Sequence, residues 1–271
     1  VTIKSGVGTT TVNHNATAFA GANDAITVTV SGTNSTTVAI TDDSLSTATV
    51  LEEVTVNSIS VANTLADLQL SSVNVPSLKI TGSTSLTITA ALDSSVTSID
   101  ASGMPTGGFT LSAAPAAAAV TVVGSGAADT IAALGAGNHN LSMGGGNDTI
   151  DFDGTWTAKD TLDGGAGSDS IDGGSGNDTI IIGEGQDVLD GGSGNDVFDF
   201  TNITDLPEFI KGGSGVDTLV LAGLSSSGLE YDDVNSDGQP DYTGIDLNKL
   251  VSIKETWTYQ DDSGNEVSEE G

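Results

Sequence analysis

The sequence predicts an all-β fold: a right-handed parallel β-roll or β-solenoid, preceded by a β-rich segment that is either solenoid-like or a sandwich. Three observations support this prediction. A glycine- and aspartate-rich pattern of nine residues recurs in the second half, short apolar–polar alternations recur in the first half, and no stretch shows strong helical periodicity. Repeats with a short fixed period are typical of solenoids, in which each repeat packs against its neighbours.

Residues 1–120 form the first predicted unit, a Ser/Thr/Val-rich series of short strands. Ile26, Val28 and Val30 alternate with threonine, as in a half-buried strand. Further apolar pairs with this spacing are Val54/Val56, Ile59/Val61, Leu68/Leu70, Val73/Val75, Leu78/Ile80, Leu86/Ile88, Phe109/Leu111 and Val120/Val122. From Ile59 onward most pairs lie about 9–11 residues apart, which favours a solenoid continuous with the second half and leaves a separate sandwich open. Residues 61–70 are the only weak helix candidate.

Residues 121–220 form the second predicted unit, which carries the pattern Gly-Gly-x-Gly-x-Asp with an apolar residue two positions after the aspartate. Copies begin at 164, 173, 182, 191 and 212. The apolar residues that should point inward are Leu162, Ile171, Ile180, Leu189 and Phe198. Two copies should make one coil, so each aspartate should stack on the one eighteen positions later. The predicted pairs are Asp160 with Asp178, Asp169 with Asp187, and Asp178 with Asp196.

The stacked aspartates predict a cation site in the turns. Two carboxylates repel each other unless a cation lies between them, and Ca²⁺ takes six to eight oxygen ligands, which carbonyl groups of the turns would complete. The predicted ligand positions are Asp148, Asp160, Asp169, Asp178, Asp187, Asp196 and Asp217, with the turn glycines Gly164, Gly173, Gly176, Gly191 and Gly194. Asp148 and Asp129 lie in irregular copies, where an ordinary turn role is an equal alternative. The regular spacing argues against a flexible linker, and it predicts that folding and metal binding are one event.

Residues 221–271 form the third predicted unit, a C-terminal cap with a second candidate calcium loop. Oxygen-bearing side chains at loop positions 1, 3, 5 and 9, with glycine at position 6, match the beginning of an EF-hand loop. These side chains belong to Asp233, Asn235, Asp237 and Asp241. Gly244 stands where a closing acid is expected and no helix is evident before the loop, so a polar surface loop is the alternative.

Composition excludes several classes of function. The chain carries 37 acidic residues against 6 lysines and no arginine, for a net charge of −31, which excludes nucleic acid as a partner. No apolar run is long enough to span a membrane, and there is no cysteine. The two histidines, His14 and His139, stand far apart, which excludes a zinc-protease motif, and His139 is expected to be exposed in a turn. We predict that the protein is not an enzyme. The number of carboxylates does not by itself exclude a glycosidase.

The copies at 164–199 and 212–220 resemble the repeats of RTX (repeats-in-toxin) proteins, which Gram-negative bacteria export by type I secretion. The resemblance implies an extracellular protein that folds around Ca²⁺, with Asp169, Asp178, Asp187, Asp196 and Asp217 as the repeat aspartates. Ile182 and the insertion at 200–211 depart from the pattern, so we expect the array to be broken there. The resemblance also implies a secretion signal within residues 221–271.

The segments 78–88 and 98–103 are similar in composition to strands of RTX-type surface-layer (S-layer) proteins. This resemblance implies a calcium-dependent scaffold on the bacterial cell surface, with copies of itself and cell-surface polysaccharide as partners. A calcium-binding module of an RTX adhesin and the noncatalytic C-terminal part of a secreted enzyme are the alternatives. The chain begins at Val1 without a leader, so we expect it to be part of a longer protein.

Overall fold

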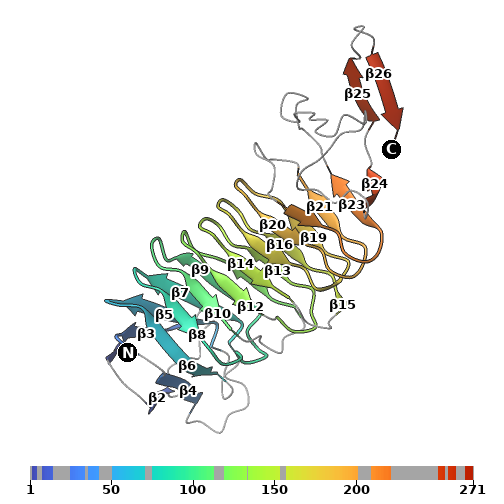
Figure 1. Cartoon of the computed structure of the whole chain (residues 1–271). Coiled ribbons are helices and arrows are strands. Elements are labelled where there is room, and N and C mark those ends of the chain that lie inside the picture. Colours follow the sequence, from blue (N-terminus) through green and yellow to red (C-terminus); the bar gives the residue numbers. More distant parts are fainter. Residues whose placement is uncertain are drawn as a thin grey trace.

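The chain winds into an elongated solenoid of parallel strands (Figure 1). A computed structural model describes residues 2–4, 8–14, 25–33, 36–42, 51–70, 75–112, 119–132, 134–152, 157–200, 209–220, 250–253, 256–260 and 266–270. Every regular element within these ranges is a β-strand. None of the described residues forms a helix long and apolar enough to cross a membrane.

Successive strands alternate between two long sheets, apart from two short extra strands and the C-terminal ones. The 12-stranded sheet contains, in order, β1 (Thr2–Lys4), β3 (Ala25–Ser31), β5 (Glu53–Ile59), β7 (Ser77–Gly82), β9 (Ser98–Gly103), β11 (Thr121–Val123), β13 (Asn140–Ser142), β16 (Thr161–Asp163), β19 (Thr179–Ile181), β21 (Val197–Asp199), β23 (Asp217–Val220) and β24 (Leu250–Ile253). The 10-stranded sheet contains β2 (Gly8–His14), β4 (Thr36–Asp42), β6 (Asn63–Gln69), β8 (Leu86–Ile88), β10 (Phe109–Leu111), β12 (Thr130–Ala132), β14 (Thr149–Asp151), β17 (Ser170–Asp172), β20 (Val188–Asp190) and β22 (Phe209–Lys211). The remaining pairs are β15 (Thr157–Ala158) with β18 (Ser175–Gly176) and the antiparallel β25 (Thr256–Gln260) with β26 (Glu266–Glu270).

The core lies between the two sheets and consists of rows of stacked apolar side chains. In the 12-stranded sheet, one row is made by Val54, Leu78, Ile99, Val122, Leu141, Leu162, Ile180, Phe198 and Leu219. In the 10-stranded sheet, the facing row is made by Leu65, Ile88, Leu111, Ile131, Ile150, Ile171, Leu189 and Ile210. All of these side chains are buried, so the prediction that the apolar repeat positions point inward is confirmed.

Strand pairing continues without a break from the first half of the chain into the repeats. Ile99 in β9 pairs with Val122 in β11, and Leu111 in β10 pairs with Ile131 in β12. The predicted all-β solenoid is therefore confirmed, and the strands before residue 120 belong to the same two sheets as the repeats. The division of the chain into three units at residues 120 and 220 stays a prediction.

Two local predictions in the first half are wrong. Residues 61–70 contain no helix but the strand β6, in which a β-bulge lies between the partners of Thr36 and Thr37. The bulge lets Leu65 and Leu68 both point inward although they are three residues apart, which imitates helical spacing. The expected pair Ile59/Val61 fails because Ser60 adopts a φ of 76° and turns the chain, leaving Val61 54% exposed.

Candidate metal-binding ladders

Glycines make the sharp turns that precede the strands of the repeats. Gly194 has a φ of 138°, in the region that residues with a Cβ rarely adopt. Its Cα also faces the carbonyl oxygen of Gly176 in the previous coil so closely that a Cβ would clash. Gly176 stands in the same relation to Ala158, with a φ of 151°. Glycine at this position therefore allows successive turns to stack directly on one another.

Two ladders of buried side chains run along these turns, one at the start of the strands of each sheet. The first ladder consists of His139, Asp160, Asp178, Asp196 and Asp217. The second ladder consists of Asp129, Asp148, Asp169 and Asp187. Along each ladder, the main-chain N–H of one residue donates a hydrogen bond to Oδ1 of the aspartate in the next coil, at 2.6–3.0 Å. Each carboxylate is therefore held in place from the coil before it.

The stacking of aspartates eighteen positions apart is confirmed for all three predicted pairs, which are Asp160 with Asp178, Asp169 with Asp187, and Asp178 with Asp196. The contact within a pair differs from the prediction, because one carboxylate accepts from the backbone of the other residue. The ladders are also not broken where we expected. Asp187 keeps its place after Ile182, and Asp217 keeps its place after the insertion because its coil is 21 residues long.

One oxygen of most ladder carboxylates lacks any hydrogen-bond partner. The atoms are Oδ2 of Asp148, Asp169, Asp178, Asp196 and Asp217, all fully buried. Buried polar atoms are nearly always paired in proteins, and an unpaired carboxylate oxygen is especially costly. Five such atoms in equivalent positions indicate a binding site that is completed by something other than the protein.

Four of these five free oxygens, all except that of Asp148, face the first glycine of their own repeat. A Cβ built on Gly191 would lie 2.6 Å from Oδ2 of Asp196 and 2.7 Å from the carbonyl oxygen of Gly212 in the next coil. On Gly173 it would lie 3.0 Å from Oδ2 of Asp178 and 2.9 Å from the carbonyl oxygen of Gly191. Each glycine thus keeps the region between a carboxylate oxygen and a carbonyl oxygen free of side-chain atoms. A hard cation that prefers oxygen ligands fits this set of donors.

The same relation holds elsewhere in the ladders. Gly164 faces Oδ2 of Asp169, and Gly212 faces Oδ2 of Asp217. Within the described residues, no group of three or more acidic or histidine side chains lies close enough to hold a metal ion. A cation at the ladders would therefore need carbonyl oxygens of the turns in addition to the carboxylates.

Burial raises the pKa of the ladder carboxyl groups. It raises the pKa of Asp148 and Asp196 to about 7 and that of Asp169 and Asp178 to about 6, and the charges of neighbouring aspartates add to the shift. A nearby cation acts in the opposite direction, because it favours the ionised form. The ladders are electrostatically unfavourable at neutral pH unless positive charge is supplied.

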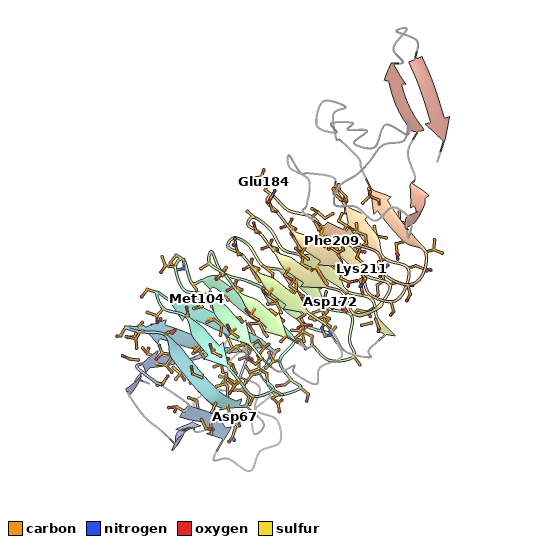
Figure 2. The ribbon with its side chains drawn as sticks, in the orientation of Figure 1. Asp67, Met104, Asp172, Glu184, Phe209 and Lys211 are labelled. Atoms are coloured by element: carbon orange, nitrogen blue, oxygen red, sulfur yellow. The ribbon has the colours of Figure 1, made fainter. Side chains whose placement is uncertain are left out.

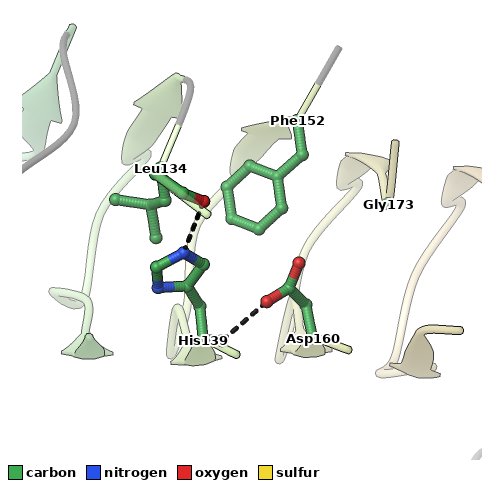
Figure 3. Close-up of a pocket in the computed structure, with 6 residues that line it drawn as sticks. Leu134, His139, Phe152, Asp160 and Gly173 are labelled. Carbon is green, nitrogen blue, oxygen red and sulfur yellow. Dashed lines mark hydrogen bonds between the residues drawn. The ribbon is translucent and has the colours of Figure 1, made fainter. Parts of the chain in front are cut away.

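His139 occupies the position of a ladder aspartate, and the expectation that it is exposed is wrong. The side chain is 3% exposed and lines a small pocket with Phe152 and Asp160 (Figure 3). Its Nδ1 accepts a hydrogen bond from the main-chain N–H of Val120 at 3.1 Å, and its Nε2 donates to the carbonyl oxygen of Gly135 at 3.0 Å. The segment 135–141 has the glycine and asparagine spacing of a repeat, which is the signal that would have identified His139 as a ladder residue.

A row of asparagines beside the ladders was missed by the sequence analysis. Oδ1 of Asn177 accepts from the N–H of Asn195, and Oδ1 of Asn195 accepts from the N–H of Val216, both at 2.8 Å. Asn138 and Asn147 make the same contact with the next coil. These bonds run in the opposite direction along the solenoid from those of the aspartates. Asparagine at the fifth repeat position, directly before the ladder residue, is the sequence signal for this row.

A further acidic row lies on the outer face of the 10-stranded sheet. Asp151, Asp172 and Asp190 are in register in β14, β17 and β20, and Lys211 follows in β22. The Lys211 ammonium forms an ion pair with Asp190, and Lys211 and Asp172 are labelled in Figure 2. The protein supplies its own cation at the end of this row, so the row differs from the buried ladders.

The second candidate loop lies outside the described residues. This applies to Asp233, Asn235, Asp237 and Asp241, and their role as calcium ligands stays a prediction.

The fold and the ladders define a parallel β-roll with oxygen-lined turns. A family model of the RTX calcium-binding nonapeptide repeat matches residues 157–189 and 183–200. The chain therefore contains RTX calcium-binding repeats, and they coincide with the part in which the coils are regular. Neither the curated proteins nor the solved structures that were compared with the chain include a match.

Proposed function

We propose that this chain is a calcium-dependent structural module whose repeat region folds on binding Ca²⁺ outside the cell. The observation that carries the proposal is the set of five buried Oδ2 atoms without a hydrogen-bond partner. Coordination to a cation would remove the cost of leaving these oxygens unpaired. The RTX calcium-binding repeats at residues 157–200 support calcium as that cation.

The residues that would hold calcium are the ladder aspartates and the turn glycines. Asp160 and Asp187 occupy the same ladders as the five aspartates with free oxygens, so we include them. Gly164, Gly173 and Gly191 would leave room for the ion beside Oδ2, while Gly176 and Gly194 allow the turns to stack. Bound calcium would supply positive charge and accept further oxygen ligands. The chain itself orients each carboxylate through the hydrogen bond to Oδ1.

Charge supports a link between binding and folding. A net charge of −31 opposes a compact state through self-repulsion, and the buried carboxylates add to this cost. Calcium sites in extracellular modules, including EF-hand-type sites, bind Ca²⁺ with dissociation constants of about 10⁻⁴–10⁻³ M. Such sites would be empty in a calcium-poor cytoplasm and filled outside the cell, so folding would follow export.

We further propose that the module is part of a cell-surface scaffold of the S-layer type, with copies of itself and surface polysaccharide as partners. The elongated solenoid supports this proposal because its faces repeat at every coil (Figure 1). Hydroxyl-bearing residues are in register along the 10-stranded sheet, at Thr64, Thr87, Thr110, Thr130 and Thr149. A surface of this kind offers many equivalent polar contacts to a neighbouring molecule.

Assembly can be tested by light scattering and negative-stain electron microscopy of the chain in Ca²⁺, in Mg²⁺ and in chelator. Ordered sheets or filaments that form only in Ca²⁺ are the expected result. A chain that folds in Ca²⁺ but stays monomeric would contradict the scaffold. Binding of that monomer to a glycan array would then favour the adhesin module instead.

A further inference from the structure

The second ladder ends at an aspartate that has no free oxygen. Oδ1 of Asp129 accepts from the N–H of Phe109 at 2.6 Å and from the Ser125 hydroxyl at 2.8 Å. Oδ2 of Asp129 accepts from the N–H of Ser125 at 2.6 Å. Ser125 is itself buried, in the turn that precedes Asp129. Ser125 therefore provides the contacts that the other ladder carboxylates lack.

The first ladder ends in an equivalent way at the neighbouring turn. His139 stands in place of an aspartate, and each of its ring nitrogens has a protein partner, Val120 for Nδ1 and Gly135 for Nε2. A neutral imidazole carries no charge that needs a cation. At these two adjacent turns of the solenoid, the ladder residues therefore have no side-chain atom that needs a metal ion as a partner.

The coils before this point are built differently. The buried aspartates among the described residues all lie at 129 or later in the chain. Main-chain bonds join the earlier turns, such as those from Leu86 to Gly108 and from Asn63 to Ser85, as they also join the ladder turns, for example from Thr179 to Asp160. Strands β3 to β10 bury two or more side chains each, as Val54 and Val56 do in β5, whereas β11 and a three-residue repeat strand such as β17 bury one. These coils have a larger core, and their described residues include no buried carboxylate oxygen without a partner.

We propose that the calcium array begins at Asp148 and that the turns of Asp129 and His139 form a metal-independent terminator. The coils before this terminator fold without calcium. They provide the surface on which the calcium-dependent coils assemble. The inference rests on the proposed calcium binding of the repeats. In a solenoid each coil contacts only its neighbours, so a folded coil can template the next one. The unpaired sheet edge at the terminator would receive the first calcium-bound coil.

Hydrogen exchange of the full chain, followed by mass spectrometry of its peptides, tests this in chelator and in Ca²⁺. The expected result is protection of residues 75–112 in both conditions and protection of residues 157–200 only in Ca²⁺. If residues 157–200 gain no protection in Ca²⁺, the proposed function fails together with the inference. If they gain protection but residues 75–112 also require Ca²⁺, the inference alone is overturned.

Variants locate the start of the array. Equilibrium dialysis should show that Asp129→Asn binds as many calcium ions as the unaltered chain, whereas Asp178→Asn binds fewer. In chelator, Ser125→Ala should exchange about tenfold faster around residues 109–132, the order expected for losing one hydrogen bond to a charged group. Ser168→Ala is the matched control, because Ser168 is an exposed serine in a repeat turn. Fewer bound calcium ions in Asp129→Asn, or equal exchange of the two serine variants, would contradict the terminator.

Discussion

Replacing Asp178 by asparagine should change the stability of the solenoid in opposite directions with and without calcium. The asparagine Oδ1 can still accept from the N–H of Asp160, so the ladder contact at 2.8 Å is kept. The buried Oδ2, which has no partner, is replaced by an amide group without charge. That amide can donate toward the carbonyl oxygen of Gly191, which faces the same space. The substitution removes a calcium ligand and, at the same time, a buried charge.

The two effects are similar in size. Without calcium, removing an unsatisfied buried polar atom should stabilise the fold by about 1–3 kcal/mol. With calcium at about 100 times the dissociation constant, a lost site should cost about 2.7 kcal/mol. For a chain of this length, a change of about 3 kcal/mol corresponds to a shift of roughly 5–10 °C in the melting temperature.

Thermal melts followed by far-UV circular dichroism measure this effect in Ca²⁺ and in chelator. Asp178→Asn should melt at a lower temperature than the unaltered chain in Ca²⁺. In chelator, where the repeats of the unaltered chain are unfolded, it should give more β signal than the unaltered chain. Asp100→Asn is the control, because it removes the same charge from a partly exposed aspartate that accepts from Ser102. A change of the same sign in both conditions would refute the assignment of Asp178 as a calcium ligand.

Three further predictions concern the turns, the core and pH. Gly191→Ala should weaken calcium binding in a calorimetric titration, because the alanine Cβ would fill the space beside Oδ2 of Asp196. Gly126→Ala is the control and should not weaken binding, since a Cβ on Gly126 would meet nothing closer than 3.5 Å. In a urea titration in saturating Ca²⁺, Ile180→Ala should lower the free energy of unfolding by about 2–5 kcal/mol. A loss of less than about 1 kcal/mol would contradict the place of Ile180 in the core. Burial raises the pKa of Asp148 from its ordinary value of 3.8 to about 7, so this group stabilises the metal-free fold fully below pH 3.8 and loses that contribution as the pH rises through 7. In chelator, the repeats should therefore give more β signal in circular dichroism at pH 5 than at pH 8, and the reverse order would count against buried, unpaired carboxylates.

The repeats could be predicted well from the sequence because two nine-residue copies make one coil. Ile171 and Leu189 point inward and Asp169 stacks on Asp187 because both relations repeat every eighteen residues. The irregular coils were harder. Asp148 stacks on Asp169 across 21 residues, so counting by nine left its role undecided, although the structure places it in the second ladder.

Other features depend on contacts that a single sequence does not encode in its spacing. The bulge that places Leu65 and Leu68 on one face is visible only from the pairing with β4. The ladder position of His139 was not predicted because histidine replaces the aspartate that marks this position in the other repeats. The free oxygens of the ladders also emerge only when the hydrogen bonds of every buried carboxylate are known, as the contrast between Asp129 and Asp178 shows.

The most direct test of calcium-coupled folding is a calcium titration followed by far-UV circular dichroism, with magnesium as the control. The account predicts that β signal from the repeats appears cooperatively on addition of Ca²⁺ and not of Mg²⁺, above a constant contribution from the coils before residue 129. A full β spectrum in chelator that does not change on addition of Ca²⁺ would contradict it.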